Sequence, residues 1–157
     1  MVRVFVQNEA GSILKHLHDE KTLVHLRTVE VSRPYPFPYG FILGTTSGDG
    51  DNLDCFVLTS QPLKTGTIVE CEPVGLLEQT EDGEEDDNVL AVPAGDEGVD
   101  VEAAVAQLRT FIAHVFDHVP GKEIATGRLL DRAAAEAHIR ACADGARLPG
   151  DPLGVGV

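Results

Sequence analysis

The chain has 157 residues, which is enough for one domain with a sizeable hydrophobic core. Its formal net charge of −14 argues against nucleic acid and anionic membrane surfaces as partners, because both are bound through basic side chains. The sequence contains no apolar run of about 20 residues, so we expect no membrane span and, by default, a cytoplasmic protein.

The first two-thirds of the chain has the pattern of short strands. Alternating or continuous apolar residues predict strands over residues 2–7, 22–27, 55–59, 67–72 and 89–92. Three prolines between residues 34 and 40 exclude a central strand or a helix and predict a rigid, extended loop that presents aromatic rings. Residues 62–66 have the composition of a hairpin connection.

The apolar period becomes helical from residue 100 onward. Asp100 is the expected N-cap of a first helix, and the Pro-Gly pair at residues 120–121 is its expected stop. A second, alanine-rich helix is predicted over residues 131–143, with Asp131 as its cap and Gly145 as its terminator.

Residues 1–147 are therefore interpreted as a single domain, followed by a loosely ordered tail at residues 148–157 that contains Pro and Gly. Many strands followed by two helices predict an α+β fold. Because the strands are short and turns are frequent, a small closed barrel is favoured over a parallel sheet.

Two acidic segments each precede an apolar strand. The first, DGDNLD at residues 49–54, carries Asp49, Asp51 and Asp54, and the second, EDGEEDD, occupies residues 81–87. Carboxylates at this density repel one another unless a cation neutralises them. Their hard oxygen atoms favour Mg²⁺, Mn²⁺ or Ca²⁺ over zinc, and we expect both segments to form one shared metal site.

A few cations and both tyrosines add the groups that a phosphate site needs. Lys15 and Arg27 are isolated cations in a chain poor in bases, while Tyr35 and Tyr39 lie on the proline-braced loop before the first acidic segment. Bound metal ions attract a polyanion and stabilise its developing charge, while Lys and Arg hold its oxygens. The predicted substrate is therefore a small anion that contains phosphate.

The chain resembles the family I soluble inorganic pyrophosphatases over residues 4–143. The family signature DGDPxD appears as DGDNLD at 49–54, and the tyrosine loop YPxNYGY appears as YPFPYGF at 35–41. The later acidic turn, DEGExDDK in the family, appears as EDGEEDDN at 81–88. Two further motifs in the same order, GSxxK and DR, appear as GSILK at 11–15 and LR at 26–27.

The resemblance implies an OB-like, five-stranded, mostly antiparallel β-barrel with two C-terminal helices, which in bacteria is often a homohexamer. It implies Mg²⁺-dependent hydrolysis of pyrophosphate to two phosphates by direct attack of water, with Mn²⁺ as an alternative metal. The implied metal ligands are Asp49, Asp51, Asp54, Glu81 and Asp86. The implied substrate-binding residues are Lys15, Arg27, Tyr35 and Tyr39. The implied catalytic residues are Asp51 as general base, Arg27 and Tyr39.

Several positions depart from the family pattern. The expected site residues, two glutamates, a lysine and a tyrosine–lysine pair, are here Gln7, Leu17, Asn88, Val119 and Pro120. The signature proline is Asn52, a change expected to loosen the turn. A charge-assisted contact contributes about 1.5–3 kcal/mol, so the loss of two lysines predicts a rate lower by about two to four decades. Lys122 and Arg128 are candidate replacement cations.

Three functions therefore stay open at the level of sequence. The first is a divergent pyrophosphatase with weakened activity. The second is a metal-dependent enzyme of the same fold that acts on another phosphorylated or biosynthetic substrate, and the third is a non-catalytic metal-binding or assembly protein. The histidines at 16 and 18 share one strand face and could bind a metal, but they are interpreted as ordinary side chains. Those at 114 and 118 have a known ligand spacing but lack the glutamate of an HExxH motif, so an interface or structural role is favoured.

Overall fold

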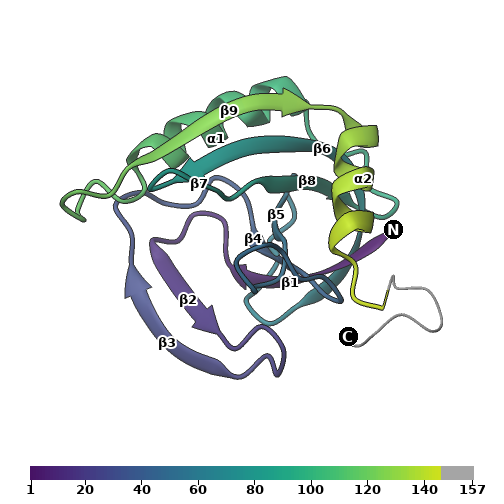
Figure 1. Ribbon diagram of the computed structural model, residues 1–157, viewed down its shortest axis with the longest axis horizontal. Coiled ribbons are helices and arrows are strands. Elements are labelled where there is room, and N and C mark those ends of the chain that lie inside the picture. Colours follow the sequence, from purple (N-terminus) through teal and green to yellow (C-terminus); the bar gives the residue numbers. More distant parts are fainter. Residues whose placement is uncertain (146–157) are drawn as a thin grey trace.

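The computed structural model describes residues 1–145, and the predicted tail at 148–157 lies outside the described residues (Figure 1). The strands are β1 (Val2–Asn8), β2 (Leu14–His18), β3 (His25–Glu30), β4 (Tyr39–Ile42), β5 (Asp54–Val57), β6 (Ile68–Glu81), β7 (Glu84–Glu85), β8 (Asn88–Pro93) and β9 (Ile124–Leu130). The helices are α1 (Val101–His114) and α2 (Arg132–Cys142). Neither described helix is long and apolar enough to span a membrane.

Five strands form a closed barrel. They pair in the order β1-β4-β5-β8-β6, and β6 pairs back with β1. Every pairing in this ring is antiparallel except that of β5 with β8. The predicted α+β fold, an OB-like five-stranded barrel with two C-terminal helices, is therefore confirmed. Strands β2 and β3 form a separate two-stranded sheet below the barrel in the view of Figure 1.

The parallel pair explains how two distant acidic segments meet. Asp54 at the start of β5 lies opposite Asn88 at the start of β8. Because parallel strands begin at the same edge of a sheet, the segments that precede β5 and β8 reach the same end of the barrel. The two acidic runs of the sequence are therefore neighbours in the fold.

The barrel sheet is apolar on both faces. One cluster packs Leu108 and Phe111 of α1 against Phe56 of β5 and Leu90 of β8. The alternating residues of the same strands, such as Cys55, join a second cluster that includes α2. Alternation of this kind follows from the two-residue period of a strand, and two covered faces explain the nearly continuous apolar runs in the sequence.

Local sequence signals account for several boundaries. The Asp100 side chain accepts a hydrogen bond from the backbone N–H of Glu102, and the Asp131 side chain accepts one from Ala134, so both predicted N-caps are confirmed. Gly40 is required by packing, since a Cβ atom there would lie 1.8 Å from the carbonyl oxygen of Phe5 in the β1–β4 ladder.

Several sequence predictions of local structure were wrong. Residues 62–66 link β5 to β6, which do not pair, so they form no hairpin. The first helix ends at His114 rather than at residues 120–121, because a turn in which the N–H of Asp117 donates to the His114 carbonyl replaces it. The strand predicted at residues 22–27 starts later, at His25, since Leu23 has a φ of 64° within the preceding turn.

The proline-braced loop carries its aromatic rings toward the interior of the fold. Tyr35 and Phe37 are 3% and 7% exposed, and Tyr35 and Tyr39 line a pocket, which agrees with the prediction that this loop presents aromatic rings. Tyr39, near the end of this loop, begins β4 and packs, partly buried, against the α1 cluster. The strand predicted at residues 67–72 continues as β6 to Glu81. Strand β9 was not predicted, since its mostly exposed residues lack a clear alternation.

Candidate active site

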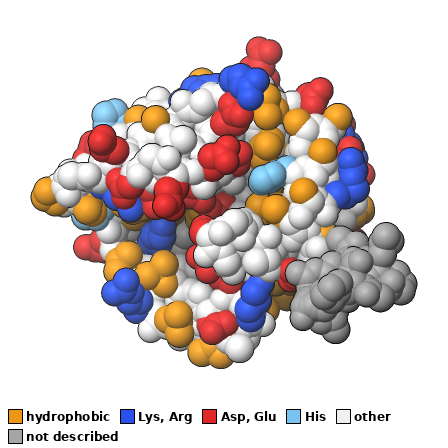
Figure 2. Space-filling view, viewed as in Figure 1, with side chains coloured by type: hydrophobic (Ala, Val, Ile, Leu, Met, Phe, Trp, Pro, Cys, Tyr) orange, Lys and Arg blue, Asp and Glu red, His pale blue; other side chains and the backbone are white. Residues whose placement is uncertain are grey.

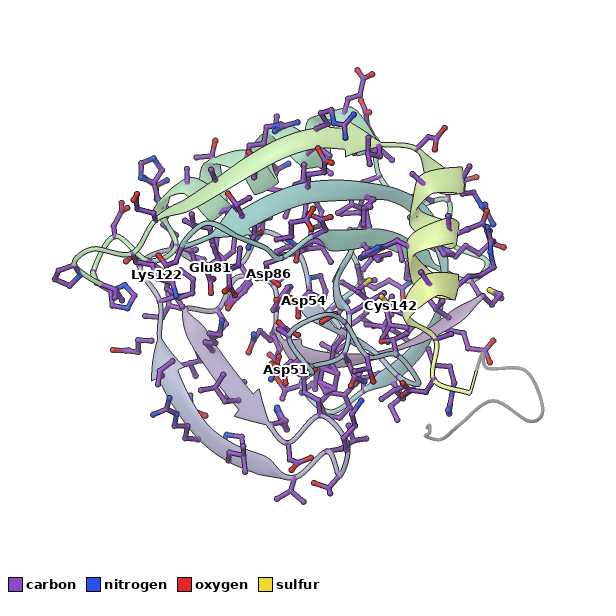
Figure 3. All side chains as sticks on the ribbon, in the orientation of Figure 1. Asp51, Asp54, Glu81, Asp86, Lys122 and Cys142 are labelled. Carbon is purple, nitrogen blue, oxygen red and sulfur yellow. The ribbon has the colours of Figure 1, made fainter. Side chains whose placement is uncertain are left out.

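The two acidic segments line one cleft. Asp49 and Asp54 from the first segment and Asp86 from the second border a cavity of about 570 Å³, together with His138 of α2. Figure 3 shows Asp51, Asp54, Asp86 and Glu81 following one another along the end of the barrel. On the same face, Figure 2 shows a groove with acidic side chains gathered along one edge. The prediction that the two segments converge is consistent with this arrangement.

Asp54 and Asp86 form the centre of this cleft. Burial and the neighbouring Asp86 carboxylate raise the pKa of Asp54 well above its ordinary value. Burial likewise raises the pKa of Asp86, and the carboxylates of Glu81 and Asp49 raise it further. Such groups accept a shared proton or a cation, and an all-oxygen set with this excess of negative charge fits a hard divalent ion. Mg²⁺ is therefore chemically compatible with the residues present.

The carboxylates are not arranged as a finished coordination sphere. Within residues 1–145, no three acidic, histidine or cysteine side chains lie in an arrangement that could hold a metal ion as they stand. Asp49 and Asp51 are exposed on their turn, and Asp49 accepts a hydrogen bond of 2.9 Å from the Asp51 backbone N–H. The assignment of Asp49, Asp51, Asp54, Glu81 and Asp86 as metal ligands stays a prediction.

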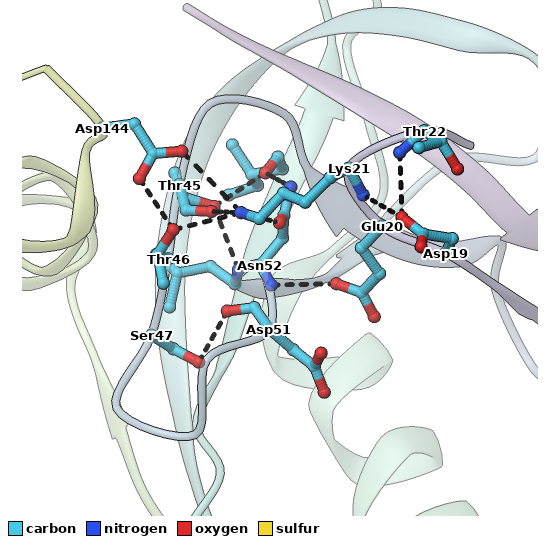
Figure 4. Close-up of polar contacts among 12 residues, drawn as sticks. Asp19, Glu20, Lys21, Thr22, Thr45, Thr46, Ser47, Asp51, Asn52 and Asp144 are labelled. Atoms are coloured by element: carbon cyan, nitrogen blue, oxygen red, sulfur yellow. Dashed lines mark hydrogen bonds and ion pairs between the residues drawn. The ribbon is translucent and has the colours of Figure 1, made fainter. Parts of the chain in front are cut away.

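Asn52 tightens the aspartate turn rather than loosening it, which corrects the sequence-based expectation (Figure 4). Its side chain is buried, donates to the carbonyl of Ile42 at 3.0 Å and accepts from Lys21 Nζ at 2.8 Å. Its backbone N–H donates to Glu20 Oε1 at 2.9 Å, a bond that proline could not make. The amide therefore replaces the rigidity of a proline ring with three hydrogen bonds.

The predicted phosphate-binding groups lie beside Asp86. Lys15, Tyr35 and Tyr39 line a smaller pocket with Glu81 and Asp86. The two tyrosine rings stack with centroids 5.7 Å apart. Burial and the nearby Asp54 carboxylate raise the pKa of both phenols, so they stay neutral hydrogen-bond donors at neutral pH. A lysine and a phenol next to the acidic cleft are suited to anion oxygens.

Arg27 does not join this group. It lies on β3, where every residue is exposed, opposite Leu17 of β2. Among residues 1–145 its side chain makes no hydrogen bond or ion pair. Its role as a substrate-binding and catalytic residue therefore stays a prediction that depends on contact with a bound anion.

Asn88, which stands where the family pattern has a lysine, is built into the site as a neutral group. It is 2% exposed, and its amide donates to Gln79 Oε1 at 2.6 Å. The Gln79 side-chain amide in turn donates to Asp86 Oδ2 at 3.3 Å. The backbone carbonyl of Gln79 accepts from the backbone N–H of Asp86 at 2.8 Å. In place of the lysine, the side-chain amides of Asn88 and Gln79 form two successive hydrogen bonds that orient the Asp86 carboxylate.

Three of the four paired histidines have a hydrogen-bond partner outside the pair, whereas the buried Nδ1 of His18 has none among the described residues, and its ring lies 5.3 Å from that of His25. His16 Nδ1 lies 2.7 Å from Thr28 Oγ1. His118 Nδ1 lies 2.6 Å from Ser32 Oγ, whereas His114 Nδ1 lies 2.9 Å from Asp117 Oδ2.

A family model for inorganic pyrophosphatase matches residues 9–147, nearly the whole chain and both acidic segments. The chain belongs to the inorganic pyrophosphatase family. Two curated members, from Saccharolobus solfataricus and Sulfolobus acidocaldarius, are 34% and 33% identical over 74% and 82% of this chain and 73% and 78% of their own lengths. The inorganic pyrophosphatase structure from Thermus thermophilus has a TM-score of 0.78 and 30% identity, covering 89% of this chain and 87% of that one.

Within this pyrophosphatase scaffold, the structure adds site residues that the sequence analysis missed. Glu20 contacts the aspartate turn, Gln79 holds Asp86, and His138 faces the cleft from α2. None belongs to a motif that the sequence displays, and each is brought in by tertiary packing. Lys122 was named from the sequence only as a candidate replacement cation. Its Nζ atom lies 3.2 Å from Glu81 Oε2.

Proposed function

We propose that this protein hydrolyses inorganic pyrophosphate to two phosphates with Mg²⁺ as its cofactor and Mn²⁺ as an alternative. One observation carries the proposal: the parallel pairing of β5 with β8 brings Asp54 and Asp86 together beside Lys15 and Tyr39. Carboxylates that hold divalent cations, next to a lysine and a neutral phenol, are the groups that phosphoryl transfer requires. Family membership and fold support the same conclusion.

Each predicted residue has a defined task in this proposal. The metal would be held by Asp49, Asp51, Asp54, Glu81 and Asp86. When bound, it supplies positive charge and lowers the pKa of coordinated water from about 15.7 toward neutrality. Asp51, exposed at the rim of the turn, takes the proton of the attacking water as general base.

The substrate-binding groups act on the phosphate oxygens. Lys15 and Tyr39 donate to them from the pocket that they line, and Tyr35 supports Tyr39 by ring stacking. Arg27 contributes its guanidinium from β3 once an anion is bound. The protein is further inferred to be cytoplasmic and to assemble as a homo-oligomer, a hexamer by family resemblance, which sedimentation would measure.

The proposal is tested by phosphate release from pyrophosphate in the presence of Mg²⁺ or Mn²⁺. We expect turnover above the metal blank, and Asp51→Asn and Asp54→Asn should each lower kcat by at least about two decades. Glu97→Gln, a change at an exposed glutamate outside the cleft, is the matched control. No turnover above the blank, or an unchanged rate in Asp51→Asn, would reject pyrophosphate hydrolysis.

A different phosphorylated substrate is the second candidate, and the neutral Asn88 favours it. This residue is buried and hydrogen-bonded to Gln79, so its position offers no cation to a second phosphate group. A panel of phosphate esters assayed under the same conditions decides between the two. Pyrophosphate as the best substrate would exclude this alternative, and metal binding without hydrolysis of any compound would favour the non-catalytic one.

A further inference from the structure

Lys122 is a cation beside the second acidic segment, outside the residues that line the acidic cleft. It lies in the turn between α1 and β9, with its Nζ atom 3.2 Å from Glu81 Oε2 and 3.5 Å from Asp82 Oδ2. Figure 3 shows Lys122 next to Glu81, at the end of the row formed by the cleft carboxylates. The side chain is 25% exposed, so solvent and small ions reach it.

Backbone contacts already fix this turn against the acidic segment. The N–H of Asp82 donates to the Glu123 carbonyl at 2.6 Å, and the N–H of Glu123 donates to Asp82 Oδ1 at 2.9 Å. The β6–β9 ladder continues directly from Glu81, which pairs with Ile124. A partly exposed ion pair adds little stability to a segment held in this way. The Lys122 ammonium is therefore free to exchange its partner without unfolding the turn.

A second cation lies against the same aromatic ring. The Nζ atoms of Lys15 and Lys122 lie 5.1 Å and 5.2 Å from the ring centroid of Phe116. Because both distances are measured to one centroid, the two nitrogens lie no farther apart than the sum of these distances. Glu81, which pairs with Lys122, lines the same pocket as Lys15. Phe116 lines this pocket too, so Lys122 contacts two of the residues that border the pocket of Lys15.

We propose that Lys122 is a second anion-binding cation beside the pocket of Lys15, paired with Glu81 until a divalent cation takes that carboxylate. The Lys122 ammonium then donates to an oxygen of a bound phosphate group. The inference rests on the proposed function, because it assigns Glu81 to the metal. What it adds is an exchange of ion-pair partners: binding of the divalent cation to Glu81 releases Lys122, which can then bind the anion.

Calorimetry with MnCl₂ alone, followed by inorganic phosphate in the presence of Mn²⁺, tests this exchange. Lys122→Gln removes a competitor for Glu81, so it should bind Mn²⁺ several-fold more tightly. It should bind phosphate at least about tenfold more weakly, because a charge-assisted contact is lost. Lys64→Gln, at an exposed lysine of the β5–β6 connection, is the control and should change neither affinity. Lys122→Arg keeps the charge and should keep most of the phosphate affinity.

A Lys122→Gln protein that binds Mn²⁺ no more tightly than wild type, or phosphate as well as Lys64→Gln does, overturns the proposal. If the glutamine variant does not fold, Lys122→Met, whose side chain can still cover Phe116, gives the same comparison. Pyrophosphate turnover by the wild-type protein is measured separately. Lys122-dependent phosphate binding without turnover would refute hydrolysis and support this proposal, whereas turnover with unchanged binding in Lys122→Gln would do the reverse.

Discussion

Glu20 is a carboxylate whose properties depend on its surroundings rather than on a motif. Burial, together with the Asp51 and Asp49 carboxylates, raises the pKa of Glu20 from 4.5 to about 7, while a hydrogen bond from Asn52 opposes this shift. The sequence places Glu20 in a turn between two strands, where a glutamate is ordinarily solvated. Only the fold puts it against the aspartate turn.

The raised pKa of Glu20 predicts a pH-dependent stability in metal-free protein. The folded state holds this proton more tightly than the unfolded chain, so the free energy of unfolding should decrease as pH rises from about 4.5 to about 7. Glu20→Gln should flatten that part of the profile, as measured by urea unfolding at a series of pH values. Glu97→Gln, at an exposed position, should keep the wild-type slope. An unchanged slope in Glu20→Gln would contradict this prediction.

At the scale of elements, the position of the acidic cleft is set by β5, β8 and the segments that lead into them. Their parallel pairing orders the acidic end of the barrel, and the Asn52 side chain ties the first segment to its surroundings. Lys21 extends this tie, since its Nζ atom also lies 3.2 Å from the carbonyl of Thr45 and 3.8 Å from Asp144 after α2 (Figure 4). The aspartate turn is therefore held by a strand-to-strand turn and by the end of a helix.

Asn52→Ala should lower the free energy of unfolding by about 1–3 kcal/mol, because it removes the side-chain hydrogen bonds of Asn52 to the buried Ile42 carbonyl and from Lys21, leaving Thr45 Oγ1 as the remaining side-chain donor to that carbonyl. It should also weaken Mn²⁺ binding, since the flanking aspartates lose their support. Lys21→Met removes only the contacts of a half-exposed ammonium and should cost less. Denaturant unfolding measures the free energy of unfolding, and a Mn²⁺ titration measures the metal affinity. Equal losses of unfolding free energy in Asn52→Ala and Lys21→Met would argue against a main role for the Asn52 side chain.

At the scale of the whole molecule, the net charge of −14 is concentrated partly in the cleft. A ligand that binds only the folded state stabilises it, by about 2.7 kcal/mol at one hundred times its dissociation constant. For a chain of this length that corresponds to a rise in Tm of about 5–10 °C.

Saturating Mg²⁺ should therefore raise Tm, and a chelator should reverse the rise. NaCl at matched ionic strength controls for general screening of the negative charge and should shift Tm much less. In Asp54→Asn, most of the Mg²⁺-dependent rise in Tm should be lost, as measured by thermal unfolding. An equal shift with NaCl, or an undiminished Mg²⁺ shift in Asp54→Asn, would indicate that the ion acts outside this cleft.

The sequence alone determined which residue types the protein carries and the class of its fold. Helical periodicity and the caps Asp100 and Asp131 placed the starts of both helices, because capping is a local interaction. The two acidic segments predicted a shared site, because like charges close in sequence need a counter-charge wherever they lie. The aromatic loop and Lys15 were found by the same local reasoning, and they do line one pocket.

The tertiary structure decided the contacts between residues far apart in the chain. Strand order, the burial of Tyr35 and the recruitment of Glu20 and Gln79 depend on which surfaces pack together, which local patterns do not encode. The same holds for Asn52, whose stabilising bonds reach Ile42, Glu20 and Lys21. A single sequence specifies periodicity and charge directly, whereas partners are fixed only when the barrel closes and buried polar groups must find hydrogen bonds.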